Sequence, residues 1–385
     1  MMGHFTVDMF GGLLPVLYPI MSDRFNLSNA DIGFIALAYT ASSSLSQPLF
    51  GYLADRYGSR NFAVASLVWS ATMVGLAGLA PTYQALLVFA MLAGLGSGAY
   101  HPQGASNAAA SVGDARRNTA MSAYTVGGTG GYALGPLIGA VLFGLFGGYG
   151  TLAVAPFGFI VAFNMLRQLR RLGLGLAGRH ASARLEQRAI PWKLLAPVMI
   201  VVMLRSWVSL SVVSFIPIWF ADQGRSAAFY SVLTTLVLAA GAVGTLAGGL
   251  LADRIGQRVV LGVSLAAAIP SLLLFAALPG TQSLVFGPLF GFSSDMGLSI
   301  TLVIAQHLLP GRVGVASGFI LGMGFVTGGI GVPVTGALAD RVGVGHALML
   351  TALLMVAAAA LVTRIPRAAL YPVHAPPQPA LEPAG

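Results

Sequence analysis

The sequence contains no cysteine, and only 8% of its 385 residues are charged. The lack of cysteine excludes disulfide bonds, thiol catalysis and cysteine-based metal sites. Soluble domains carry about 25% charged residues, so an ordinary soluble fold is excluded as well. The sole lysine is Lys193, and no G-x-x-x-x-G-K-[ST] sequence is present, so transport or catalysis driven by ATP at a P-loop is not expected.

Apolar residues make up most of what is present: 56% of the chain is hydrophobic, and the mean hydropathy is +0.83. A transmembrane helix needs about 20 mainly apolar residues. The first apolar stretch continues as a span, so no cleavable signal peptide is expected. The pattern predicts an all-α polytopic membrane protein with twelve transmembrane helices, at residues 4–22, 32–54, 61–80, 84–110, 117–145, 149–166, 195–221, 227–252, 258–278, 283–308, 313–338 and 346–363.

The basic charge, formally +9, is distributed unevenly between the two sides of these spans. Of the 20 Lys and Arg residues, sixteen fall between spans on one side and three on the other, Arg24, Arg225 and Arg341. Cytoplasmic segments carry the excess of Lys and Arg in membrane proteins. The prediction is a protein of the plasma (inner) membrane with both termini in the cytoplasm, whose basic charge reflects topology rather than binding to nucleic acid.

A charged decapeptide occurs twice. G-Y-L-A-D-R-Y-G-S-R at Gly51–Arg60 returns as G-L-L-A-D-R-I-G-Q-R at Gly249–Arg258, an offset of 198 residues. Shorter matches share nearly this offset, such as Y-P-I at 18–20 with I-P-I at 216–218. We interpret each decapeptide as a short charged loop at a membrane face. Six spans per repeat is an even number, so the two halves should insert with the same orientation around a central cavity.

The repeat divides the chain into four segments. Residues 1–166 form the N-terminal half, and residues 194–364 the C-terminal half. The basic segment 167–193 is expected to be a cytoplasmic linker, and the proline-rich tail, 365–385, a disordered cytoplasmic segment. Almost nothing precedes the first span, and the sequence leaves open whether the true start of the protein lies upstream of Met1.

A third, partial copy of the decapeptide is present at Gly336–Gly343, with the sequence G-A-L-A-D-R-V-G. It follows the eleventh span and would lie outside. Nothing similar occurs near its repeat position, Leu142. We interpret it as an ordinary helix exit.

The motif G-x-L-A-D-R-x-G-x-R after the second span resembles the signature of the major facilitator superfamily. The resemblance implies that Asp55 contacts the eleventh span and Asp253 the fifth, as a latch made when the protein faces outward and broken when it faces inward. The residues implied in this latch are Gly51, Asp55, Arg56, Gly58, Arg60, Asp253, Arg254 and Arg258.

Span five carries Gly131, Gly135, Pro136 and Gly139, a pattern that resembles the Gly-Pro motif of drug/proton antiporters in this superfamily. Glycines every four residues, including Gly127, predict close helix packing. Three short stretches are similar to the fosmidomycin-resistance branch of efflux pumps: H-F-x-x-D-M at 4–9, Y-H-P-Q at 100–103 and V-G-G at 126–128. Gln103 departs from the acidic residue expected there.

Inserting an ionisable side chain into a bilayer costs about 2.5–3.5 kcal/mol on insertion scales, so each such residue inside a span is a candidate functional residue. Asp8 lies in span one, with His4 one turn before it on the same face. Such a pair can take up and release a proton, although His4 alone could be interfacial. Asp295, in the middle of span ten, is a third candidate for proton coupling.

Arg205 in span seven is the repeat partner of Asp8, at an offset of 197. These two residues could meet as an ion pair, or Arg205 could hold an anionic substrate, because a guanidinium suits carboxylates and phosphonates. His101 in span four is a candidate for substrate or proton binding, with a structural role as the alternative. The remaining substrate-binding candidates are Tyr39 and Gln47, from a polar stripe on span two, and Tyr124.

These observations predict a secondary active transporter: a monomer without cofactor or metal that exports a small drug-like or anionic compound in exchange for protons, by alternating access. A proton-coupled importer of an organic anion or metabolite on the same fold is the first alternative. A polytopic membrane enzyme is the second, but the sequence shows neither a His/Asp cluster with metal-ligand spacing nor a nucleophile elbow.

Overall fold

The structure is a computed structural model of the chain. It describes all residues except 112–116, 176–189, 310–312, 367–368 and 371–385. It also leaves undescribed the side chains of Asp55, of Ala109, of residues 117–122, of residues 313–319 and of Leu321. The predicted linker and tail therefore lie largely outside the described residues.

Helices make up the described chain, and they follow the predicted spans closely. The first half contains α1 (Met2–Phe25), α2 (Asn29–Tyr57), α3 (Ser59–Ala77), α4 (Tyr83–Ala110), α5 (Arg117–Phe146), the 3-10 turn η2 (Gly147–Tyr149) and α6 (Gly150–Arg171). The second half contains α7 (Trp192–Asp222), α8 (Ala227–Ile255), α9 (Gln257–Ala277), α10 (Ser283–Asp295), α11 (Leu298–Leu308), α12 (Val313–Val342) and α13 (Val344–Val362).

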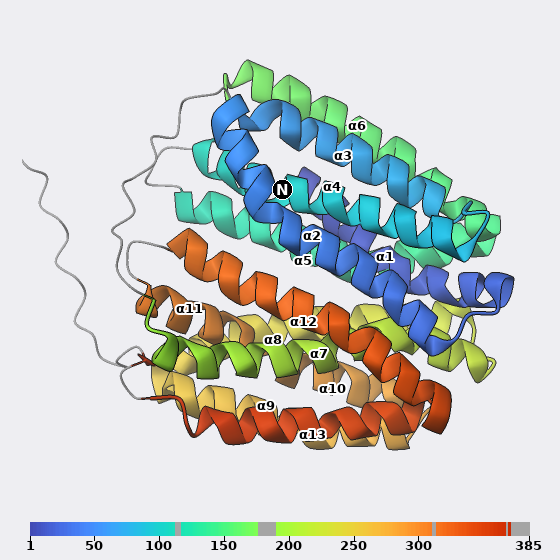
Figure 1. Cartoon of the computed structure of the whole chain (residues 1–385), viewed down its shortest axis with the longest axis vertical. Coiled ribbons are helices and arrows are strands. Elements are labelled where there is room, and N and C mark those ends of the chain that lie inside the picture. Colours follow the sequence, from blue (N-terminus) through green and yellow to red (C-terminus); the bar gives the residue numbers. More distant parts are fainter. Residues whose placement is uncertain (112–116, 176–189, 310–312, 367–368, 371–385) are drawn as a thin grey trace, which may run out of the picture.

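The two halves lie side by side, with α1–α6 in one group and α7–α13 in the other (Figure 1). They meet where α2 packs on α12, α5 on α8 and α1 on α7. The internal repeat relates the α2–α12 contact to the α8–α5 contact, and it relates α1 to α7. Within the described residues, nine helical stretches are long and apolar enough to cross a membrane, and one of them, Ala123–Arg171, covers both α5 and α6. Together with α2 and α3 this gives twelve crossings, which confirms the predicted two-repeat, twelve-span fold.

The repeated decapeptide is not the loop that we expected. Residues Gly51–Tyr57 continue α2 to its end, and α3 begins at Ser59, so Gly58 alone separates the two helices. In the second copy, Gly256 alone separates α8 from α9. The φ angles of Gly58 and Gly256 are 91° and 93°. Glycine has no Cβ to clash in this region, so one residue can end one helix and start the next.

The tenth span is also not the continuous helix that we expected. It is split into α10 and α11 at Met296 and Gly297, which places Asp295 at the end of α10 rather than in the middle of a helix. The carbonyl of Asp295 accepts a hydrogen bond from Thr245 Oγ1 on α8, 3.0 Å away. The Thr245 hydroxyl therefore supplies a hydrogen bond to a backbone carbonyl beside the break. Inside a membrane, backbone groups that a break leaves without a helical partner need such a bond.

The glycines of α5 pack closely against α1, as predicted. A methyl group at Gly131 would collide with the carbonyl oxygen of Phe5, and one at Gly135 would lie 2.7 Å from that of Met9. At Gly139 the space is tight but less so: a methyl group would lie 3.3 Å from the ring of Phe143 and 3.4 Å from Cβ of Leu13 on α1. Small residues let membrane helices approach to this distance. The contact holds the α1 segment that carries His4 and Asp8 firmly against α5.

Candidate functional site

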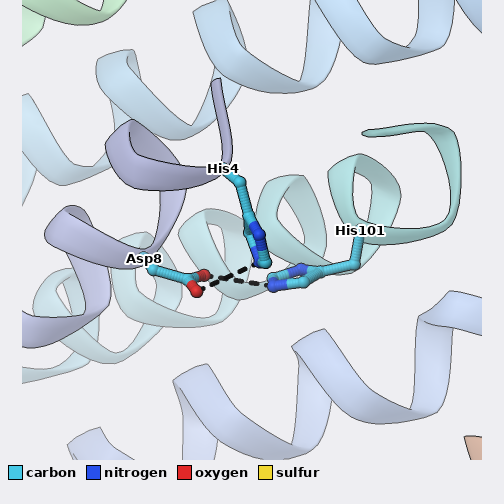
Figure 2. A group of neighbouring side chains, drawn as sticks. All are labelled: His4, Asp8 and His101. Carbon is cyan, nitrogen blue, oxygen red and sulfur yellow. Dashed lines mark hydrogen bonds and ion pairs between the residues drawn. The ribbon is translucent and has the colours of Figure 1, made fainter. Parts of the chain in front are cut away.

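Three titratable side chains converge between α1 and α4 (Figure 2): His4, Asp8 and His101. His4 Nε2 lies 3.2 Å from Asp8 Oδ2, and His101 Nε2 lies 3.1 Å from Asp8 Oδ1. The His4 side chain is 10% exposed, whereas those of Asp8 and His101 keep 21% and 28%. The cluster is thus largely buried but can still be reached by a small solute.

The neighbouring helices fix the His4 ring. His4 and Asp8 are four residues apart on α1 and so share a face. The His4 ring stacks on Tyr124 of α5, with centroids 3.9 Å apart and an interplanar angle of 16°. A methyl group at Gly128, one turn further along α5, would collide with the His4 ring and Asp8 Oδ2. Gly128 therefore provides the space that the cluster occupies.

The hydrogen bonds at the other ring nitrogens set the tautomers of both histidines. His4 Nδ1 lies 2.7 Å from the carbonyl oxygen of Tyr124, and His101 Nδ1 lies 2.7 Å from that of Ser97. A carbonyl oxygen can only accept, so each Nδ1 must carry the proton and donate. In the neutral ring Nε2 then has a lone pair, and this lone pair faces the carboxylate of Asp8.

It follows that the cluster needs added protons. A lone pair opposite a carboxylate oxygen repels it, whereas a proton between the two atoms makes a charge-assisted hydrogen bond. Two such contacts are present, one on each oxygen of Asp8. The cluster can therefore pass from a net charge of −1 with no added proton, through neutral, to +1 with two. The geometry therefore offers two positions, one on each oxygen of Asp8, at which a proton could lie between an imidazole and the carboxylate.

The sequence analysis found no cluster of this kind, because His101 is 93 residues from Asp8 in the chain. Ligand atoms of the three side chains lie within 4.8 Å of one another. Two imidazoles and a carboxylate also match the ligand types that transition metals accept. Packing of span one against span four would have predicted the cluster. It places His101, in the Y-H-P-Q stretch, beside His4 and Asp8, in the H-F-x-x-D-M stretch.

Arg205 does not pair with Asp8, as one of our two interpretations proposed, but with Asp295. The distance from Arg205 Nη1 to Asp295 Oδ1 is 2.6 Å, and Arg205 Nη2 donates to Ser206 Oγ at 3.3 Å. The Arg205 side chain is 8% exposed and that of Asp295 28%. Asp295 lies close to the position of Gly241 on α8. Each half therefore holds one polar cluster that links its first and fourth spans.

The candidate substrate-binding tyrosines lie around the first cluster. Tyr124 donates from its hydroxyl to the carbonyl of His101 at 3.1 Å. The hydroxyl of Tyr39 reaches α1 beside Gly11. Tyr132 of α5, which the sequence analysis missed, lies within electrostatic range of both Asp8 and Asp295. Gln47 is half-buried on the same helix as Tyr39.

Gln103, which stands where an acidic residue was expected, is 2% exposed and ties α4 to α2 by donating to the carbonyl of Phe50 at 2.8 Å. A carboxylate could not donate that hydrogen bond. The departure from the expected pattern thus gives Gln103 a structural role in this chain.

The residues of the implied latch are only partly described. The side chain of Asp55 lies outside the described part, and Asp253 and Arg254 are exposed. Arg56 lies over the ring of Tyr57, 5.5 Å from its centroid. Arg60 Nε donates to the carbonyl of Leu174 at 2.9 Å, and Arg258 donates to that of Ile365. The bonds of Arg60 and Arg258 therefore stay within their own halves and fix the chain after the sixth span of each, α6 and α13.

Comparisons with known proteins agree with this architecture. The model of the family "Major Facilitator Superfamily" matches residues 1–222 and 195–384. The fosmidomycin resistance protein of Escherichia coli (strain K12) is 31% identical over 352 residues, which cover 88% of this chain and 85% of that protein. A Cupriavidus pinatubonensis protein named "Probable 4-methylmuconolactone transporter" is 25% identical, over 89% of this chain and 82% of that protein.

A solved structure shows the same fold. The crystal structure of a bacterial homologue of the human lysosomal transporter Spinster, in an inward-facing and occupied conformation, matches with a TM-score of 0.84 and 17% identity, over 96% of each chain. The repeated motif, the paired halves and the family match lead to one conclusion. The chain belongs to the major facilitator superfamily, and it is a multi-pass membrane transporter rather than an enzyme.

Proposed function

We propose that the protein is a proton-coupled exporter of a small anionic or amphipathic compound. The observation that carries this proposal is the arrangement of His4, Asp8 and His101, in which both Nε2 atoms face one carboxylate and both Nδ1 protons are used elsewhere. Such a cluster gains hydrogen bonds when it takes up protons and loses them on release. That behaviour supports proton exchange as the source of energy for transport.

The second cluster supports an anionic substrate. The guanidinium of Arg205 carries five donors in a planar fork, which suits carboxylates and phosphonates. Oδ1 of Asp295, 2.6 Å from Nη1 of Arg205, uses one of these donors. An incoming anion would compete for the same donors, and protonation of Asp295 would release Arg205 to bind it. Tyr39, Tyr124, Gln47 and His101 are proposed to contact the rest of the substrate.

Transport by alternating access requires the two halves to rock about the space between them. We place both termini and the linker in the cytoplasm, in keeping with the charge bias, and the protein in the plasma (inner) membrane. We assign the halves to residues 1–166 and 194–364. On this view Asp55 and Asp253 close the cytoplasmic side in one state. The packed seam of Gly131 and Gly135 with α1 would limit proton leak beside the cluster.

The direction of transport is proposed to be export, because a relative that covers most of the chain is a fosmidomycin resistance protein. Import of an organic anion is the alternative. The second relative, whose name refers to transport of 4-methylmuconolactone, supports it.

Inverted membrane vesicles with an imposed pH gradient test the proposal. With fosmidomycin as the probe, an interior made acidic should drive its accumulation, and a protonophore should abolish it. The Arg205→Gln variant should fail to accumulate the probe, whereas Gly130→Ala, whose added methyl group meets no atom within 4 Å, should behave as the wild type. Accumulation that ignores the pH gradient would exclude proton coupling, and movement only in the reverse gradient would favour import.

A further inference from the structure

The N-terminus of α2 is bonded by groups from both halves of the protein. The first four backbone N–H groups at a helix start have no partner within the helix. Two of the four in α2 are satisfied locally by a capping box, in which Ser28 N donates to Asp31 Oδ2 at 3.0 Å and Asp31 N donates to Ser28 Oγ at 3.1 Å.

Asp340, on the last turn of α12, satisfies the other two. Asn29 N donates to Asp340 Oδ1 at 2.7 Å, and Ala30 N donates to Asp340 Oδ2 at 3.1 Å. The Asn29 side chain adds a third bond through Nδ2, at 2.9 Å. A carboxylate at this position also meets the positive end of the helix dipole. One carboxylate of the C-terminal half thus completes the helix start of the N-terminal half.

The backbones of α2 and α12 come close together at the same place. A methyl group at Gly33 would collide with the backbone of Pro333, and one at Gly336 would collide with the backbone of Asn29. The contact by Asp340 is therefore made at a point where the two halves touch directly. By the proposed topology this is the outer end of both helices.

The local sequence explains why Asp340 is placed there. α12 ends with L-A-D-R-V-G at 338–343, and α2 ends with L-A-D-R-Y-G at 53–58. In both cases the helix stops before a glycine of positive φ, 91° at Gly58 and 82° at Gly343. The aspartate consequently lies on the last helical turn. Because α2 and α12 cross the membrane in opposite directions, the aspartate of α12 is at the level of the start of α2.

The repeat-related contact, between α5 and α8, lacks this carboxylate. The repeat offset of 197–198 aligns Asp340 with Leu142 or Phe143 of α5, and neither of these is acidic. The start of α8 is capped by its own Ser226, whose Oγ accepts from Phe229 N at 3.3 Å. A carboxylate from one half therefore caps a helix of the other half at the α12–α2 contact, but not at the repeat-related α5–α8 contact.

We infer that Asp340 is a positioning residue for transport, which acts through the N-terminus of α2 to hold the outer ends of the two halves together. Its three bonds stabilise the conformation that is closed outside and must break before the protein opens outward. The partial motif at Gly336–Gly343, first interpreted as an ordinary helix exit, is then the outer counterpart of the signature motif that ends α2 at the cytoplasmic side.

Distance measurements between paired spin labels test this inference without any substrate. The chain has no cysteine, so a thiol-reactive spin label attaches only to the cysteines that are introduced. Gln84→Cys with Thr281→Cys reports the outer side, and Asn61→Cys with Val259→Cys reports the cytoplasmic side. All four positions are exposed. The purified full-length protein in lipid nanodiscs would be compared in both label backgrounds by double electron–electron resonance.

The Asp340→Asn variant should lower the ratio of outer-closed to outer-open protein by about fivefold or more, since it removes the charge from three hydrogen bonds. Outer distances should lengthen while inner distances shorten. Asp340→Glu should restore part of the closed population, and the matched control Leu142→Asn should match the wild type. Unchanged distributions in Asp340→Asn, or equal broadening of both label pairs, would overturn the inference, as would the same shift in Leu142→Asn. Because no proton gradient or substrate is used, this outcome is independent of the proposed coupling.

Discussion

Asp8 and His101 are 93 residues apart in the chain, yet the carboxylate of one lies 3.1 Å from Nε2 of the other. Arg205 and Asp295 repeat this relationship in the second half, 90 residues apart and 2.6 Å from each other. Each pair joins the first and fourth spans of its repeat. The two halves therefore share one geometry but differ in chemistry: two imidazoles face a carboxylate in the first half, and a guanidinium faces a carboxylate in the second.

Neutralising Asp8 tests the first cluster. Asp8→Asn keeps the shape of the side chain. The amide does not bind a proton, and it has no negative charge to stabilise a protonated His4 or His101. We expect pH-driven accumulation of substrate to be lost, whereas exchange of substrate across the membrane at equal pH continues, because that step needs no proton transfer. Transport by the variant in vesicles, with and without a pH gradient, measures both steps.

A second measurement makes this test independent of substrate identity. In unbuffered detergent solution, the wild type should take up at least about one more proton than Asp8→Asn as the pH is lowered through the range in which histidine and carboxylate groups titrate. Equal proton uptake by the two proteins, or uphill transport by Asp8→Asn with the wild-type pH dependence, would show that Asp8 is not the proton carrier.

Adding one methyl group on α5 tests the geometry of the cluster without removing any of its members. Gly128→Ala places that group against the His4 ring and Asp8 Oδ2. We expect proton-driven transport to fall about tenfold or more, because the cluster must shift to make room. Gly130→Ala, on the same helix, meets no atom within 4 Å and should transport normally.

Helix propensity cannot explain a loss of this kind, since replacing glycine by alanine inside a helix favours the helix by about 1 kcal/mol. Both variants share this gain in helix propensity, so a lower melting temperature of Gly128→Ala than of Gly130→Ala would measure the cost of the added contact with the cluster. If both transport at the wild-type rate, the cluster tolerates displacement and its tight packing has no role in coupling.

Hydropathy and repetition were sufficient to predict the fold, for a physical reason. The bilayer requires each span to be a long apolar helix, and duplication fixes the relation between the halves. The breaks were not predictable in the same way. The split of span ten at Met296 depends on a bond from Thr245 of α8, which hydropathy does not register.

The candidate site was predicted in part. His4 and Asp8 follow from helical spacing, and His101 was singled out as a polar residue inside a span. Their convergence depends on tertiary packing, as does the choice of Asp295 rather than Asp8 as the partner of Arg205. The role inferred for Asp340 required the contact of α12 with α2, because its local sequence alone is that of a helix end.

Labelling of single cysteines tests the topology. The charge bias places Asn61 at the cytoplasmic side and Gln84 at the outer side, and both are exposed. In intact cells, Gln84→Cys should react with a membrane-impermeant thiol reagent, whereas Asn61→Cys should react only after the membrane is permeabilised. The cysteine-free parent protein gives the background. The reverse pattern would invert the proposed orientation and with it the direction assigned to the Asp340 contact.

The last prediction concerns the pair in the second half. Removing one partner of a buried ion pair leaves an uncompensated charge and costs about 3–5 kcal/mol, whereas replacing both partners costs far less. Arg205 has an 8% exposed side chain and Asp295 a 28% exposed one, so the penalty should be larger for Asp295→Asn, which strands the better-buried cation, than for Arg205→Gln.

We therefore expect melting temperature and abundance to fall in the order Arg205→Gln and then Asp295→Asn, and to recover in the double variant. Neither Arg205→Gln nor the double variant should accumulate an anionic probe, because the guanidinium is absent from both. Thermal unfolding by intrinsic fluorescence and vesicle transport, measured on the same four proteins, separate the two effects. A double variant that regains transport together with stability would show that Arg205 serves only to neutralise Asp295, and the anion-binding role would have to be assigned elsewhere.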